Sequence, residues 1–112
     1  MSSESPIAAP VASSSASIMQ DERDAIAALY ASGVTAFQAG DYAGAERQLR
    51  RFAARAPADS RGEDAAFLIA LARARRGDSV GAASSAREYL HRFPHGLRRR
   101  EAEQLVSPAG SN

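Results

Sequence analysis

The 112-residue sequence contains no cysteine, no lysine and no tryptophan. Without cysteine the chain can form neither a disulfide nor a thiolate metal site. Apolar runs are short, and none approaches the roughly 20 residues that a membrane-spanning helix requires. The formal net charge of +1 creates no overall field that would attract nucleic acid or an anionic membrane. We therefore expect no nucleic-acid partner and no direct insertion into a membrane.

Both ends of the chain have little bulky apolar content. Residues 1–20 are mostly serine, alanine and proline. Such a segment buries too little apolar surface to offset the conformational entropy that is lost on ordering, so we predict a disordered tether there. Residues 107–112 are predicted to be a disordered tail. One small domain over residues 21–106 remains, and a core of that size is marginal on its own.

The sequence does contain an internal repeat with a period of 37 residues. The segment Phe37–Ala45, FQAGDYAGA, is matched by Ala74–Ala82, ARRGDSVGA. Farther along, the endings R-x-F-x-x-R-x-P and R-x-Y-x-x-R-x-P match at the same offset and close with Pro57 and Pro94. Such self-similarity is typical of stacked supersecondary units, whose function usually lies in a surface shared between units.

Two helices are predicted in the first unit, over about residues 22–57. Apolar residues between Ile26 and Phe37 recur at the spacing of one helical face. Gly40 is expected to end this helix as a left-handed residue, and Asp41 to N-cap the next one. Pro57 closes the unit.

The second unit, over about residues 60–94, repeats this pattern. Ser60 with Glu63 predicts a capping box at the start of its first helix. Val80 is among the residues expected to face inward from its second helix. A short helix over about residues 97–106 follows, in which Leu97 is expected to be buried, and we interpret it as a cap over the open end.

The repeated residues are those that define the tetratricopeptide repeat, which the chain resembles from about Ala25 to Leu105. Small residues occupy the positions where the helices of each unit cross, Gly33 in the first unit and Ala70 in the second. The aromatic endings are similar to those of bacterial envelope proteins such as the Tol-Pal coordinator proteins. No segment alternates with the period of a strand. We expect an all-α fold of two antiparallel helix-turn-helix repeats plus a capping helix, and the resemblance implies a right-handed α-superhelix.

The resemblance also implies a partner-binding groove. In this family the first helix of each unit lines the concave side, and the matching positions are Tyr30, Val34, Phe37, Gln38, Asp64, Phe67, Leu71 and Arg75. Such a groove suits an amphipathic helix or an extended apolar peptide of a protein partner. Aromatic residues at helical spacing are also typical of core packing, and that alternative stays open for Tyr30, Phe37 and Phe67. A homodimer is a further expectation, because a repeat buries its faces only against neighbours.

The remaining constellations favour no chemistry. Glu88, His91 and His95 have a spacing that resembles a metal site, but Pro94 interrupts the helix between the two histidines. The run Arg98–Arg100 is too short for a nucleic-acid patch. No phosphate-binding loop and no catalytic triad is recognisable. We expect no metal, no cofactor and no enzymatic activity.

These inferences converge on a scaffold or adaptor, a protein-interaction module without catalysis. Two alternatives stay open. One is a regulatory domain of a membrane-tethered bacterial regulator, and the other is an accessory protein that binds nucleic acid through the arginine-rich end. The compartment is also open: a fragment of a tethered protein would belong to the periplasm or envelope, and any other chain to the cytoplasm.

Overall fold

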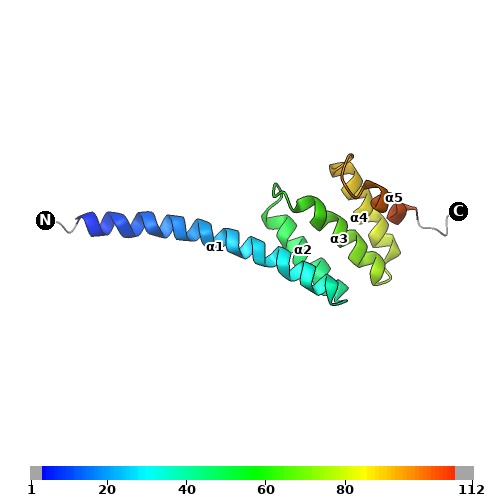
Figure 1. Ribbon diagram of the computed structural model, residues 1–112, viewed down its shortest axis with the longest axis horizontal. Coiled ribbons are helices and arrows are strands. Elements are labelled where there is room, and N and C mark those ends of the chain that lie inside the picture. The colour runs from blue at the N-terminus through cyan, green and yellow to red at the C-terminus, as the bar shows by residue number, and fades with distance from the viewer. Residues whose placement is uncertain (1–3, 108–112) are drawn as a thin grey trace.

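The computed structural model describes the backbone of residues 4–107 and the side chains of residues 16–107. Those residues form five helices and no strand: α1 (Glu4–Gln38), α2 (Tyr42–Arg55), α3 (Gly62–Arg75), α4 (Ser79–Arg92) and α5 (Arg99–Val106). Each helix packs against the next, so α1–α2 and α3–α4 are hairpins, and α5 lies against α4 and α3 (Figure 1). The predicted all-α fold of two helical repeats and a short terminal helix is confirmed.

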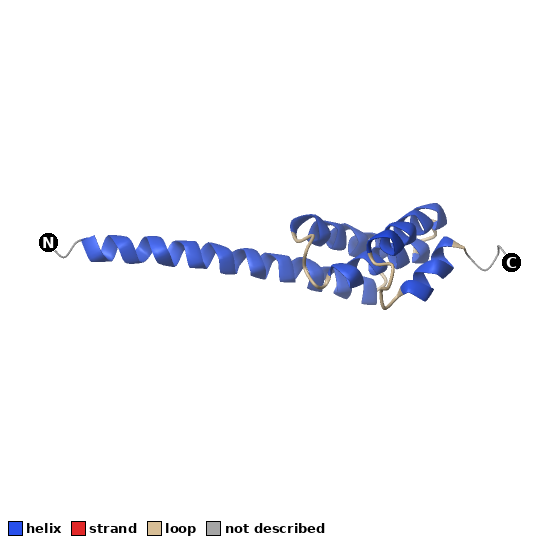
Figure 2. Ribbon diagram, turned by 90° about the horizontal axis from the view of Figure 1, so that it is seen from above, coloured by secondary structure: helices blue, strands red, loops and turns tan. Residues whose placement is uncertain are grey.

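Helix α1 is much longer than the others, and its N-terminal part forms an arm (Figures 1 and 2). The molecule measures 80 × 29 × 17 Å because this arm extends beyond the other four helices. The structure thus differs from the predicted tether over residues 1–20, since α1 already begins at Glu4. Low apolar content means that a segment buries little surface. It does not stop a helix from propagating out of a packed one.

Two parts of the predicted termini lie outside the described residues. They are residues 1–3 of the predicted tether and residues 108–112 of the predicted tail.

The 37-residue period of the sequence is preserved helix by helix. Helices α2 and α4 begin at Tyr42 and Ser79, and α3 and α5 begin at Gly62 and Arg99, each pair 37 residues apart. Helix α5, with its 8 residues, is therefore the counterpart of the beginning of α3. The terminal helix that we interpreted as a cap is thus also the first helix of a third unit, ending at Val106.

The two hairpins contain the same turn. Gly40 and Gly77 have φ angles of 84° and 91°, in the left-handed region that favours glycine. The carboxylates of Asp41 and Asp78 each accept a hydrogen bond from the backbone N–H three residues later, at 3.0 and 2.9 Å. This bond satisfies a donor that the first turn of a helix otherwise leaves unpaired. The predicted N-cap at Asp41 is confirmed, and Asp78 caps α4 in the same way.

The core consists of two clusters. One lies where α1, α2 and α3 meet, and the other lies where α3, α4 and α5 meet. The first is centred on Leu49 and Phe52 of α2, and the second on Phe67 of α3 and Tyr89 of α4. None of these four side chains is more than 3% exposed. Buried alanines surround them, and their small size lets the helix backbones approach closely.

Two residues predicted to be buried are exposed, Val80 by 82% and Leu97 by 88%. Val80 precedes the buried Ala82 by two residues, or about 200° of helix rotation, so it faces the opposite side of α4. Leu97 lies before the first residue of α5 and is therefore not on the buried face of that helix.

The predicted capping box of Ser60 and Glu63 is wrong. Arg61 is the N-cap residue of α3, and no side chain caps this helix. The Glu63 carboxylate instead accepts hydrogen bonds from the Tyr89 hydroxyl and from the Leu97 N–H, both at 2.7 Å. A fully buried tyrosine hydroxyl requires a partner, and this requirement decides where Glu63 points.

Candidate partner-binding surface

Seven of the eight residues predicted to line the groove reach the surface. Four are half-buried and apolar or aromatic, and three are exposed and polar: Tyr30, Val34, Phe37 and Leu71, then Gln38, Asp64 and Arg75. Helices α1 and α3, which carry them, are in contact with each other. We call these seven residues the inner surface.

The eighth residue, Phe67, belongs to the core. It is 3% exposed and packs edge-on against Tyr89, with ring centroids 6.0 Å apart. The guanidinium of Arg98 covers it from the start of the α5 segment, 5.2 Å from the ring centroid. Phe67 is therefore not accessible to a partner, and the core alternative applies to it.

Tyr30 occupies the equivalent position one repeat earlier but is only half-buried. Its ring lies 5.3 Å from that of Phe52, and the Arg61 guanidinium lies 5.6 Å from the Tyr30 centroid. Asp59 holds Arg61 in place at 2.8 Å, and the hydrogen bonds from Arg61 lower the pKa of the Asp59 carboxyl to about 2. Burial, and then the negative charge of Asp64, raise the pKa of the Tyr30 hydroxyl. The first unit thus presents an aromatic residue where the second unit buries one.

A second difference between the units lies at the hairpin turns. In the first unit Phe37 and Tyr42 form an edge-on aromatic pair with ring centroids 5.2 Å apart. Arg75 lies over both rings and donates a hydrogen bond to the Tyr42 hydroxyl at 3.3 Å. The equivalent residues of the second unit are Ala74 and Ser79, which carry no ring.

These small residues border a hollow of about 160 Å³ where the α3–α4 turn meets α5. Ala74, Ser79 and Ala82 line one side of it, and Gln104 and Leu105 of α5 line the other. We call it the α5 hollow. Two of its lining residues, Ala74 and Ser79, occupy the positions at which the first unit carries the aromatic pair.

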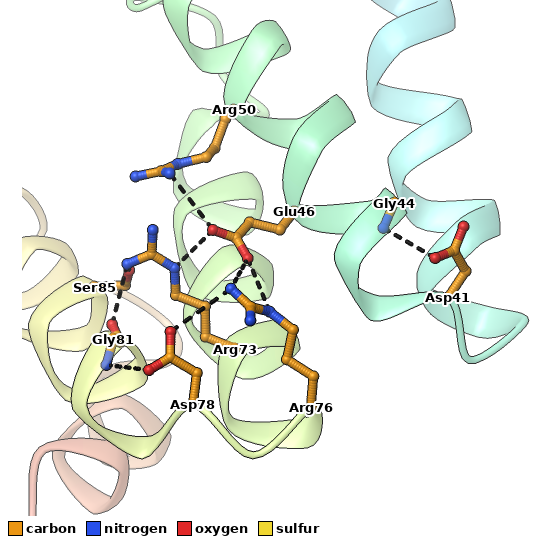
Figure 3. Close-up of polar contacts among 9 residues, drawn as sticks. All are labelled: Asp41, Gly44, Glu46, Arg50, Arg73, Arg76, Asp78, Gly81 and Ser85. Atoms are coloured by element: carbon orange, nitrogen blue, oxygen red, sulfur yellow. Dashed lines mark hydrogen bonds and ion pairs between the residues drawn. The ribbon is translucent and has the colours of Figure 1, made fainter.

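The contact between the hairpins contains a carboxylate that sequence reasoning missed. Glu46 of α2 is 7% exposed and accepts hydrogen bonds from Arg73 at 2.8 Å and from Arg76 at 2.7 Å (Figure 3). Burial alone would raise the pKa of Glu46, but the hydrogen bonds from these two arginines outweigh burial, and the pKa is lowered. Arg73 also donates to the Ser85 hydroxyl at 2.9 Å. This network joins α2, α3 and α4 and so fixes how the hairpins stack.

Within the described residues, no group of three or more His, Cys, Asp or Glu side chains is placed to bind a metal ion. The set of Glu88, His91 and His95 accordingly forms no such group. In the same part of the chain no helix combines the length and the apolar character needed to cross a membrane.

The geometry is that of a short array of helical hairpins, a class of protein-interaction fold. Residues 22–104 match the YfiO family, described as outer membrane lipoprotein. This match covers most of the sequence, so the chain belongs to the YfiO family. The predicted resemblance to tetratricopeptide repeats of bacterial envelope proteins is confirmed. No curated protein and no solved structure matches the chain significantly.

Proposed function

We propose that this protein is a non-catalytic scaffold that binds a segment of another polypeptide on its inner surface, at the bacterial envelope. The observation that carries the proposal is the row of half-buried apolar side chains on α1 and α3, bordered by exposed polar ones. Side chains of a partner would remove the remaining apolar area from water, which is the main favourable term in such binding. Membership of the YfiO family supports both a protein partner and an envelope setting.

The α5 hollow is the site to which we assign an anchor residue of the partner. An interface commonly derives most of its affinity from a few large side chains seated in pockets. The first unit supplies its own rings at this place, from Phe37 and Tyr42, whereas the second unit has Ala74 and Ser79. The second unit therefore offers the space that a partner's aromatic or large aliphatic residue would occupy.

A library of random peptides displayed on phage tests this function with the full chain. The variant Ala74→Phe with Ser79→Tyr fills the α5 hollow with the residues that the first unit carries, so the same backbone accepts them. Peptides selected on the native protein should share a large apolar residue and should bind the filled variant at least about tenfold more weakly.

The control variant is Val80→Tyr, which adds an aromatic ring at an exposed position of α4. It should bind the selected peptides as the native protein does. Selected peptides that bind the filled variant equally well would contradict the anchor. A failure to select any peptide sensitive to Phe37→Ala or Leu71→Ala would contradict the scaffold function itself.

Self-association is a second mode of binding that we propose, on the basis of the arm. Ile18 and Met19 are 67% and 60% exposed on a helix segment that extends away from the body of the molecule. Pairing of two arms would cover both side chains. Multi-angle light scattering should give a dimer mass for the native chain and a monomer mass for Ile18→Glu with Met19→Glu. A monomer at every concentration of the native chain would rule this mode out.

A further inference from the structure

A second groove lies on the opposite side of α3 from the inner surface. Ala66 and Ile69 form its floor, Arg50 and Ala53 of α2 one wall, and Glu88 and Arg92 of α4 the other, around a hollow of about 170 Å³. Residues 66 and 69 are separated from Asp64 and Leu71 by about half a turn of helix, which places the two surfaces back to back.

A wider hollow on α2 adjoins this groove, and Arg50 borders both. The second hollow has a volume of about 460 Å³ and is lined by Arg47, Arg50 and Arg51 of α2 together with Arg76 and Glu46. We call the two hollows together the arginine groove. Figure 3 shows three of its members, Arg50, Arg76 and Glu46, at the contact between the hairpins.

The positive charge of the arginine groove is not balanced from within. The Glu46 carboxylate lies 2.7 Å from Arg76 and 2.8 Å from Arg73, but 3.5 Å from Arg50. Arg47 and Arg51 form no ion pair with any described residue. The groove therefore carries guanidinium groups that are free to bind carboxylates from outside the chain.

The repeat itself does not require arginine at these places. The positions equivalent to Arg47 and Arg51 in the second unit hold Ser84 and Glu88. Helix α4 nevertheless has the same length as α2 and the same aspartate N-cap. Arg47 and Arg51 are exposed, and α4 forms without arginine at the equivalent positions, so folding does not account for them.

We propose that the arginine groove binds an acidic segment of a partner polypeptide, in which carboxylates alternate with small apolar side chains. The guanidinium groups match carboxylates in bidentate geometry, and the alanine and isoleucine floor matches the apolar residues. A polypeptide fits better than a nucleic acid, because Glu46 and Glu88 border the groove and would repel a continuous row of phosphates. The recessed apolar floor likewise fits a chain that enters the groove better than a flat anionic membrane.

Fluorescence anisotropy with a labelled peptide of alternating Glu and Ala residues tests the proposal on the full chain. The variant Arg47→Ser with Arg51→Glu introduces the residues of the second unit and should weaken binding by at least about tenfold. The variant Arg87→Ser with Arg100→Glu makes the same change in net charge at exposed positions that do not line the groove. It should change affinity by no more than about twofold.

Three results would overturn the proposal. The first is an equal loss of affinity in both variants, which would show a general charge effect. The second is no measurable binding of the peptide to the native chain. The third is that phosphatidylserine vesicles or single-stranded DNA displace the peptide and bind more tightly with the same dependence on Arg47 and Arg51. Phe37→Ala, Leu71→Ala and the filled variant Ala74→Phe with Ser79→Tyr should all bind this peptide normally, so a failure of the proposed scaffold function is distinguished from a failure here.

Discussion

Gly33 of α1 lies directly against Leu49 of α2, so that a Cβ atom at residue 33 would stand 2.5 Å from the Leu49 Cγ. One repeat later the equivalent positions hold Ala70 and Ala86, which are fully buried in one cluster. The first hairpin thus combines the smallest residue with a large one, and the second combines two small ones. What the crossing constrains is the combined volume of the pair.

We predict that Gly33→Ala destabilises the fold by about 2 kcal/mol. Overpacking at so short a contact costs about 3 kcal/mol, and the higher helix propensity of alanine returns about 1 kcal/mol. Leu49→Ala alone should cost about 3 kcal/mol through the cavity that it creates. The double variant recreates the pair of the second hairpin, so its loss should be smaller than the sum of the two single losses. Urea unfolding of all four proteins measures this coupling, and strictly additive losses would contradict it.

Replacing Glu46 by Gln should lower the free energy of unfolding by about 3 kcal/mol. The change leaves Arg73, whose side chain is 15% exposed, without its charged partner. Arg50→Gln is the matched control, because Arg50 is 57% exposed and contacts Glu46 only at 3.5 Å. The control should change stability by less than about 1 kcal/mol. Thermal and urea unfolding of both variants provide the measurement.

Acid should weaken the contact between the hairpins through the same carboxylate. The pKa of Glu46 is lowered in the folded state from its usual 4.5. A lowered carboxyl pKa stabilises the fold above the unfolded-state value, and that contribution is lost as the pH falls through the folded-state value. Stability should therefore decline as the pH falls below about 4.5, and less steeply in Glu46→Gln. The pKa of Asp59 is also lowered, to about 2, so the comparison is made in an Asp59→Asn background. Identical slopes with and without Glu46 would refute the assignment.

The two N-caps should be energetically equivalent. Asp41→Ala and Asp78→Ala each remove one hydrogen bond to a backbone N–H, at 3.0 and 2.9 Å. Each should cost about 1 kcal/mol. The caps are in separate hairpins, so the double variant should lose about 2 kcal/mol. A difference between the single variants of more than about 1 kcal/mol would show that the repeats are not equivalent at their turns.

Tyr89→Phe should loosen α5 more than the rest of the molecule. The Tyr89 hydroxyl donates to Glu63 at 2.7 Å and accepts from the Arg98 N–H at 2.9 Å. Its removal leaves the Arg98 N–H without that acceptor, at a cost of about 1 to 2 kcal/mol. Amide hydrogen exchange should accelerate in α5 and remain unchanged in α2. Uniform acceleration in all helices would indicate a global loss of stability instead.

The local elements of this fold are predictable because each is encoded within a few neighbouring residues. Gly40 and Asp41 specify a helix end and a new N-cap whatever surrounds them, and the same holds for Gly77 and Asp78. The 37-residue repeat adds the one long-range prediction that the sequence alone provides: residues 37 positions apart occupy equivalent places in the two units.

The polar contacts are not predictable in the same way. Glu46 accepts from arginines 27 and 30 residues away. The chain has 14 basic residues, all arginine, and spacing does not select among them. The position equivalent to Glu46 in the second unit is Ala83, so the repeat does not predict this contact either.

The aromatic residues that were predicted to line a groove show a third case. Periodicity places Tyr30 and Phe67 at equivalent positions of the two units, but only Phe67 is closed off. Arg98 and α5 cover the ring of Phe67. In the first unit Arg61 and α3 occupy the equivalent positions beside Tyr30. Tyr30 and Phe67 still differ in exposure, because α3 and α5 do not cover the two rings equally. Such packing depends on the assembled helices and cannot be derived from the spacing of residues.

The length of α1 has a mechanical consequence. A helix rises 1.5 Å per residue, so the stretch from Glu4 to the start of the family match at residue 22 spans about 27 Å. A flexible linker of that length would let its two ends move and rotate independently of each other. A continuous helix instead holds its two ends in a fixed relative orientation. Because the same helix contributes Tyr30 and Phe37, turning the far end would reorient the inner surface as well.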